Sequence, residues 1–182
     1  MERVIVIGSS CSGKTTLARR LAEVLGSPHI ELDALHWGPG WSEVPRERFR
    51  AALEERVKGD RWVVDGNYSV VRDIVWHRAT DAVWLNYPFH VVFSRALVRT
   101  LKRIVLREVL YNGNRESFRK AFLSRGSILW WVIKTFKRRR RNYRALFASG
   151  AFPNIRLTEL RRPRDAKRLL AALHDNHEVG GR

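Results

Sequence analysis

Cysteine is nearly absent from the sequence, and none of its apolar runs is long. The single cysteine, Cys11, excludes a disulfide within the chain, which fits a reducing compartment such as the cytoplasm. The longest later apolar run, residues 128–133, is far shorter than the ~20 residues that a membrane-spanning helix needs. The apolar run before Gly8 is too short for a signal peptide. We therefore expect a cytoplasmic protein without a membrane span.

Acidic residues are scarce in one segment, and this scarcity creates most of the net charge. The whole chain of 182 residues carries a net charge of +17. Residues 95–144 contain 16 basic and 2 acidic side chains, a net of +14, whereas residues 1–94 contain 12 of each. So strong and local a field attracts polyanions. Candidate partners are therefore ATP, a phosphorylated substrate, nucleic acid and anionic lipid.

Strand-like and helix-like patterns alternate along the chain, whose length suits one domain with a full core. This alternation implies a parallel sheet with helices on both faces. The predicted strands span 2–7, 29–32, 61–65, 81–86 and 153–157, and the predicted helices span 14–25, 45–58, 70–77, 89–110, 117–147 and 163–173. We expect one domain over 1–174, with an insertion at about 99–145 and a frayed tail at 175–182.

Residues 8–15 match the phosphate-binding pattern G-x-x-x-x-G-K-[ST], between a predicted strand and a predicted helix. Glycines there allow backbone N–H groups to surround phosphate oxygens, and the positive end of the following helix points at them. Lys14 would reach the β- and γ-phosphates, and the Thr15 hydroxyl would ligate Mg²⁺. We therefore expect ATP and Mg²⁺ as cofactors. The expected nucleotide-binding residues in this segment are Gly8, Ser9, Ser10, Cys11, Ser12, Gly13, Lys14, Thr15 and Thr16.

This P-loop, in a short chain with Asp33 after the second strand, resembles the small P-loop kinases, which include adenylate, shikimate and gluconate kinases. Residues 29–37 (HIELDALHW), 63–68 (VVDGNY) and 112–116 (NGNRE) resemble most closely the DNA topology modulation proteins, which are adenylate-kinase-like. The resemblance covers about residues 3–170. It implies an α/β, three-layer P-loop NTPase fold of the nucleoside and shikimate kinase type, with a five-stranded parallel sheet and a basic helical lid.

Two carboxylates, Asp33 and Asp65, follow predicted strands at the sheet edge where such folds bind ligands. By the resemblance, Asp33 follows a strand beside the P-loop strand and either contacts Mg²⁺ through water or accepts the proton of the attacking hydroxyl. Asp65 resembles the second carboxylate on the metal side. Each could instead serve only its turn. Adenylate kinases carry an arginine for AMP phosphate after the glycine that corresponds to Gly66, and its absence here argues against AMP as acceptor.

Cations recur at three- and four-residue steps along the predicted helix 89–110. In similar kinases a lid begins there, and its arginines stabilise the transferring phosphoryl group. Arg99 and Arg103 match the positions of those arginines best, and both are candidate catalytic residues with Lys14, Asp33 and Asp65. A solvated basic face is the alternative. The full series is Arg95, Arg99, Lys102, Arg103 and Arg107.

Two other features have two interpretations each, and a third has one. Five consecutive cations at 137–141 could bind nucleic acid or a membrane surface, or could form a solvated helix end. Aromatic residues near the second and third strands could stack on a base or a sugar, or could belong to the core. In similar kinases, the loop that contains Arg161 lies on the adenine, where a guanidinium plane would stack on the base. The aromatic residues are His36, Trp37, Trp41 and Tyr68.

These patterns together predict a kinase that transfers the γ-phosphoryl group of ATP to a small acceptor such as a nucleotide, a nucleoside or a sugar-like hydroxyl. The alternatives are a nucleic-acid-binding ATPase that affects DNA topology and an ATP-binding module without turnover. The kinase hypothesis requires the cations to converge on the nucleotide. The nucleic-acid hypothesis requires them in an outward-facing stripe.

Replacing Lys14 by alanine should abolish ATP binding and leave the chain folded, because no neighbouring group can replace its charge-assisted contact with phosphate. Calorimetric titration with ATP measures the first effect, and thermal unfolding measures the second. An unchanged ATP affinity in Lys14→Ala would contradict the interpretation of residues 8–15.

Overall fold

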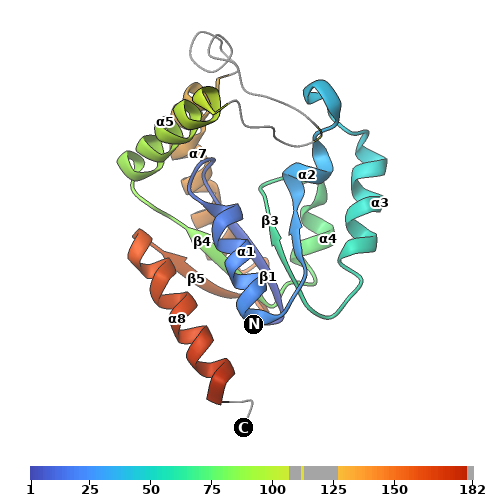
Figure 1. The fold of residues 1–182 in the computed structure, drawn as a ribbon. Coiled ribbons are helices and arrows are strands. Elements are labelled where there is room, and N and C mark those ends of the chain that lie inside the picture. Colours follow the sequence, from blue (N-terminus) through green and yellow to red (C-terminus); the bar gives the residue numbers. More distant parts are fainter. Residues whose placement is uncertain (107–111, 113–126, 180–182) are drawn as a thin grey trace.

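The computed structural model describes residues 1–106, 112 and 127–179. Five parallel strands form one sheet in the order β2-β3-β1-β4-β5, and helices cover both of its faces (Figure 1). This confirms the predicted α/β architecture. The strands are β1 (Arg3–Gly8), β2 (His29–Glu31), β3 (Trp62–Asp65), β4 (Asp81–Leu85) and β5 (Arg156–Leu160). The helices are α1 (Lys14–Leu25), α2 (Leu32–His36), α3 (Arg46–Arg56), α4 (Arg72–Trp76), α5 (Phe89–Val105), α7 (Ile128–Ala148) and α8 (Pro163–Val179), with 3-10 turns η1 (Pro39–Trp41) and η2 (Ser69–Val71).

Apolar side chains bury both faces of the sheet and form two core clusters. Val4 and Val6 of β1 face the first cluster, which α1, α5 and α8 cover. Ile5 and Ile7 face the second cluster, which α3 and α4 cover. Since both faces of β1 are covered, it has apolar residues at every position from Val4 to Ile7 rather than an alternating pattern.

Helix α7 belongs to both clusters. Val132 and Phe136 pack in the first cluster, and Tyr143 packs in the second. The Phe136 ring contacts Phe89, which follows β4, with 5.3 Å between ring centroids. The Tyr143 hydroxyl bonds to Asn67, which follows β3. Both contacts lie beyond carboxyl ends of strands, so α7 passes the carboxyl edge of the sheet between its residues 136 and 143.

The last strand begins later than the sequence predicts. It spans Arg156–Leu160 instead of 153–157, because Pro153 has no N–H to donate to a strand ladder. Arg156 lies opposite Asp81, and its Nε donates to the buried Asp81 carboxylate at 2.8 Å. Helix α8 also exceeds its predicted end near residue 173 and continues to Val179, into the segment expected to be frayed.

The position of Asp33 differs from the expected one. Asp33 lies in the first turn of α2 rather than in a loop. Its strand, β2, is not beside the P-loop strand, because β3 lies between β2 and β1. Asp65 therefore ends the strand that neighbours β1, and Glu31 at the end of β2 lies opposite Asp65.

Much of the predicted lid lies outside the described residues. This holds for Arg107 and for the 112–116 motif except Asn112. The described parts of the predicted insertion belong to α5 and α7, which pack against each other. Within 1–106 and 127–179, every helix is too short or too polar to cross a membrane.

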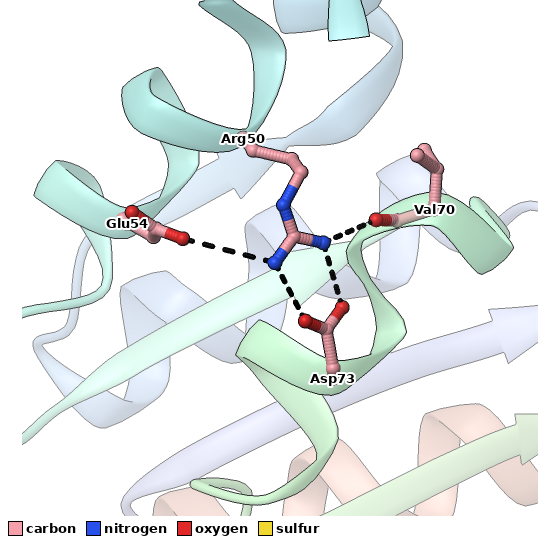
Figure 2. Close-up of polar contacts among 4 residues, drawn as sticks. All are labelled: Arg50, Glu54, Val70 and Asp73. Carbon is pink, nitrogen blue, oxygen red and sulfur yellow. Dashed lines mark hydrogen bonds and ion pairs between the residues drawn. The ribbon is translucent and has the colours of Figure 1, made fainter. Parts of the chain in front are cut away.

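Arg50 joins α3 to the turn η2 and to the first turn of α4 (Figure 2). Its guanidinium donates to the two Asp73 carboxylate oxygens at 2.8 and 2.6 Å and to the Val70 carbonyl at 2.6 Å. Glu54 lies 3.9 Å from the same guanidinium. The hydrogen bond from Arg50 lowers the pKa of Asp73 to about 2. Because Val70 follows Tyr68 by two residues, Arg50 also holds the turn that presents Tyr68.

Replacing Arg50 by alanine or Asp73 by asparagine should lower the melting temperature by no more than about 4 °C, since the Asp73 carboxylate is exposed and solvent screens the pair. The two effects should add only in part, because both changes break the Arg50–Asp73 pair, while Arg50→Ala also removes the hydrogen bond to Val70. Because the pKa of Asp73 is lower in the folded protein, its ion pair stabilises the fold fully at pH values above the ordinary pKa near 3.8. That stabilisation is lost as the pH falls to about 2. Thermal unfolding at both pH values tests this, and an Asp73→Asn effect that persists at pH 2 would contradict it.

Candidate phosphate-binding site

The P-loop connects the central strand β1 to α1. Its backbone is left-handed at Cys11, with φ 64°, and at Gly13, with φ 97°. No side chain caps the N-terminus of α1, so its first N–H groups have no side-chain acceptor. A Cβ at Gly13 would lie 3.1 Å from Nη1 of Arg95, which leaves little room for a larger residue. This geometry creates the backbone cradle and helix end that bind anions.

Arg95 of α5 contacts the backbone of the P-loop. Its Nη1 donates to the Ser12 carbonyl at 2.6 Å, and its guanidinium lies 5.1 Å from the centre of the Tyr87 ring. The Lys14 ammonium donates to the Ser9 carbonyl at 3.2 Å. Burial lowers the pKa of Lys14, as does the charge of Arg139, while Asp33 and Asp65 raise it. An arriving phosphate would compensate the buried charge of Lys14.

Thr15 lies between two carboxylates. Its hydroxyl donates to Asp65 Oδ2 at 2.6 Å, and Glu31 Oε1 lies 3.2 Å from the same hydroxyl oxygen. His29 Nε2 lies 3.0 Å from the other Asp65 oxygen. Hydroxyl and carboxylate oxygens are the ligands that Mg²⁺ prefers. These oxygens therefore suit a magnesium ion at Thr15, although no group of three or more His, Cys, Asp or Glu in the described parts forms a ready-made metal site.

Asp33 lies apart from this hydroxyl–carboxylate group. Its Oδ1 accepts a hydrogen bond from the Tyr68 hydroxyl at 2.7 Å, while Asp33 itself lines the same cavity as the P-loop. The structure thus joins Asp65, but not Asp33, directly to Thr15. A carboxylate held through one oxygen keeps its second oxygen for another partner.

Asn67 connects three parts of the site. Its amide nitrogen donates to the Gly8 carbonyl at 2.6 Å, and its amide oxygen accepts from the Tyr143 hydroxyl at 2.7 Å. Burial raises the pKa of Tyr143 to about 12, so the hydroxyl keeps its proton at neutral pH. Gly66 approaches the start of α2 so closely that a Cβ there would lie 2.7 Å from Leu32 Cβ. The Gly66–Asn67 pair therefore needs both of its residue types.

A cavity of about 750 Å³ opens beside the P-loop and is lined by α1, α5 and the start of α8. The Nε of Arg99 is buried and has no hydrogen-bond partner among the described residues. An unpaired buried guanidinium nitrogen is costly unless a ligand meets it. The carboxylates of the lining are Glu31 and Asp33, and its cations are Lys14, Arg19, Arg20, Arg95, Arg99, Arg103 and Lys167. So many cations around one volume suit a polyphosphate.

Other predicted residues lie elsewhere. Arg161 is 75% exposed, donates to Glu159 at 2.9 Å and is not part of the cavity lining. The predicted aromatic group does form, since the His36 ring lies 4.7 Å from Trp37 and 4.5 Å from Tyr68. It also packs on the buried Phe49, which joins it to the core.

The sequence assigned no role to several residues that the structure places in the site. Glu31, His29 and Asn67 lie in the segments that carry the family resemblance, but nothing in their spacing revealed their partners. Arg95 belongs to the basic series that the sequence did single out and shares a face of α5 with Arg99 and Arg103, but the series gave no sign of its bond to the Ser12 carbonyl. Tyr143 had no such signal, because its partner lies 76 residues away.

Comparisons with known proteins identify the fold. No protein-family model matches the chain, and the comparison with curated proteins gives no match. A gluconokinase from Sinorhizobium meliloti 1021 matches with 23% identity and a TM-score of 0.51, over 100% of this chain and 98% of its own. A shikimate kinase from Acinetobacter baumannii, in complex with shikimate, matches with 16% identity and a TM-score of 0.57, over 97% and 94%. A shikimate kinase from Bacteroides thetaiotaomicron matches with 15% identity and a TM-score of 0.55, over 97% and 98%.

These likenesses show that the chain has the three-layer fold found in small P-loop kinases. The predicted five-stranded parallel sheet of this fold class is thereby confirmed.

Replacing Arg99 and Arg103 together by alanine should weaken ATP binding by roughly 10- to 100-fold, because charge-assisted hydrogen bonds to phosphate are lost. The fold should persist, since neither side chain belongs to the two core clusters. Calorimetric titration with ATP measures the effect. Lys134→Ala, on an exposed position of the neighbouring α7, is the control. Equal affinities in the two variants would favour a solvated basic face.

Proposed function

We propose that the chain is an ATP-dependent phosphotransferase, a kinase that moves the γ-phosphoryl group of ATP to a small acceptor. The observation that carries this proposal is the convergence of seven cations, the P-loop and two carboxylates on one cavity. In the reaction, a bond forms between an acceptor oxygen and the γ-phosphorus, and the bond from this phosphorus to the ADP oxygen breaks. The fold likeness agrees with the proposal.

The P-loop and the arginines of α5 have separate tasks in this proposal. Backbone N–H groups of the P-loop and Lys14 bind the β- and γ-phosphates. Thr15 and the carboxylate Asp65 would hold Mg²⁺, which would neutralise phosphate charge. Arg99 and Arg103 stabilise the charge that develops on the transferring group, and they exclude water from it.

Asp33 is the proposed proton acceptor. It lines the cavity, and Tyr68 fixes one of its oxygens. The second oxygen accepts the proton of the acceptor hydroxyl as the new bond forms. Because Asp33 does not contact Thr15, this role fits its position better than direct metal binding does.

A nucleic-acid-binding ATPase is the second candidate, favoured by the charge of the 95–144 segment. Its outward stripe would consist of Lys137, Arg138 and Arg141, which are exposed. Arg139 and Arg140 of the same run are half-buried, so the run does not present five cations to one partner. The structure therefore gives the kinase more support.

Membership of the DNA topology modulation family and residence in the cytoplasm are further parts of this proposal. The first is supported by the motifs at 29–37 and 63–68, because their side chains contact the P-loop and each other. Glu31 and Asp65 accept from Thr15, Asn67 donates to Gly8, and Tyr68 donates to Asp33. The second is supported by the single cysteine of the sequence.

A screen of ATP consumption tests the proposed function. Mg·ATP is supplied with nucleosides, nucleotides, sugars and sugar acids, and ADP and the phosphorylated product are measured separately. A phosphorylated product supports the kinase. ATP binding without a product from any acceptor would point to a binding module without turnover, and ATP hydrolysis stimulated by DNA would favour the second candidate.

Replacing Asp33 by asparagine should leave ATP binding near normal and reduce phosphoryl transfer at least ~100-fold, the low end for a lost general base. Tyr68→Phe is the matched variant, because it keeps the carboxylate and removes only the hydrogen bond. It should have the smaller effect. Transfer by Asp33→Asn within a few-fold of the unmodified protein would show that Asp33 only supports its turn.

A further inference from the structure

The outward side of α5 is apolar, although exposed sides of helices normally carry polar or charged residues. Leu97, Val98, Leu101 and Val105 are 36%, 65%, 43% and 76% exposed. Leu97, Leu101 and Val105 follow one another at four-residue steps, so they form one stripe along the helix. The two core clusters of the described residues do not include this stripe.

Helix α7 extends this apolar surface. The Phe89 ring stacks on Phe93 of α5 and contacts Phe136 of α7. From there α7 lies alongside α5, and it begins near the point where α5 ends (Figure 1). Ile133 and Trp130 precede Phe136 by three and six residues and are 46% and 51% exposed. Both exposed sets therefore extend from the Phe89–Phe136 contact toward the end of α5. Together they form the apolar α5–α7 face, which consists of Leu97, Val98, Leu101, Val105, Trp130 and Ile133.

The charge on this surface has one sign. Neither α5 nor α7 contains an aspartate or a glutamate. Lys102 follows Leu101 and Lys134 follows Ile133, and both lysines are exposed. Exposed aliphatic side chains and a tryptophan are thus combined with cations. This composition is typical of helices that lie on a membrane surface, where tryptophan favours the level of the lipid headgroups.

The ATP cavity opens on another side of α5. Its lining includes Arg95 and Arg99, each of which precedes a residue of the apolar stripe by two positions. Two residues turn an α-helix by about 200°, so Leu97 and Leu101 point away from these arginines. A partner on the apolar α5–α7 face therefore leaves the cavity accessible.

Three kinds of partner suit parts of this surface, and one suits all of it. A nucleic acid would neutralise the lysines but would leave the apolar side chains in water. A second copy of the chain would bury the apolar side chains but would bring two sets of cations together. An anionic lipid bilayer accepts the apolar side chains and neutralises the cations at the same time.

We propose that the apolar α5–α7 face docks the protein on the surface of an anionic lipid bilayer. Leu101, Trp130 and Ile133 enter the boundary between headgroups and acyl chains, and Lys102 and Lys134 meet anionic headgroups. The association is peripheral and reversible. It goes beyond the proposed kinase activity and does not depend on it.

Flotation with lipid vesicles provides the first test. The whole chain is mixed with vesicles of phosphatidylcholine alone, or with vesicles in which about a third of the lipid is phosphatidylserine. We expect partition onto the anionic vesicles to be at least ~10-fold stronger. Addition of Mg·ATP should not change it, because the cavity lies on another side of α5. Absence of binding to the anionic vesicles would overturn the proposal.

Two double variants separate the apolar from the charged contribution. Trp130→Ala with Ile133→Ala keeps every charge and should weaken partition onto the anionic vesicles at least ~10-fold, because less apolar area enters the bilayer. Lys102→Gln with Lys134→Gln keeps the apolar side chains and should weaken it roughly 25-fold, since each cation near an anionic surface contributes about fivefold.

A third double variant is the matched control. Arg46→Gln with Arg48→Gln removes the same charge from exposed positions of α3, which covers the other face of the sheet. It should bind the vesicles like the unmodified protein. A loss equal to that of the lysine variant would assign the binding to the net charge of the whole chain and would overturn the proposed docking face.

Two further results would also overturn it. Unchanged binding by Trp130→Ala with Ile133→Ala would show attraction by charge alone, as a nucleic acid also produces. A dimer in analytical ultracentrifugation that this variant dissociates, without any vesicle binding, would assign the face to a second copy. Thermal unfolding identifies a folding defect. If this variant does not fold, Val98→Ser with Leu101→Ser takes its place under the same criteria.

Discussion

The side-chain amide of Asn67 is the contact on which the geometry of the site depends. It donates to Gly8 at the start of the P-loop and accepts from Tyr143 of α7, while its own backbone follows β3. The carboxyl edge of a parallel sheet brings such segments near one another, but it does not fix their spacing. An amide can, because it is a donor and an acceptor in one rigid plane. The phosphate cradle, the end of β3 and the part of α7 around Tyr143 therefore keep a fixed relation.

The cavity beside the P-loop has an excess of positive charge, because few carboxylates lie near its cations. The cavity has many more cations than carboxylates in its lining, and the buried Nε of Arg99 has no hydrogen-bond partner among the described residues. Such an arrangement is unfavourable in the free protein and becomes favourable when phosphate arrives. The lowered pKa of Lys14 is one sign of this unfavourable free state. The fold tolerates it because the two apolar clusters on either side of the sheet supply the stability.

Local signals in the sequence predicted the fold well. The glycines, the Lys-Thr pair and the apolar stripe of α1 specify β1, the P-loop and α1 through contacts a few residues apart, and the predicted bounds of α1 agree with the structure. The start of β5 was predicted too early, because the register opposite Asp81 depends on a partner 75 residues away.

The candidate site was only partly predictable for the same reason. Thr15 and Asp65 could be proposed from motif and strand end. The order of the strands, which places Asp65 rather than Asp33 beside the P-loop strand, is a property of the whole sheet. Periodicity alone did not show which cations of the 137–141 run face inward, because that depends on where α7 meets the two core clusters.

Helix α7 packs against both core clusters, through Phe136 in the first and Tyr143 in the second. For the packing of α7, the number of residues between these two positions therefore matters more than their identity. Each residue turns an α-helix by about 100°, so one residue inserted between Phe136 and Tyr143 would turn every later side chain away from its partner. Substitutions at the exposed positions of this stretch leave that phase unchanged. Over evolutionary time, the stretch should therefore accept many exchanges at positions 137, 138 and 141 and very few insertions or deletions.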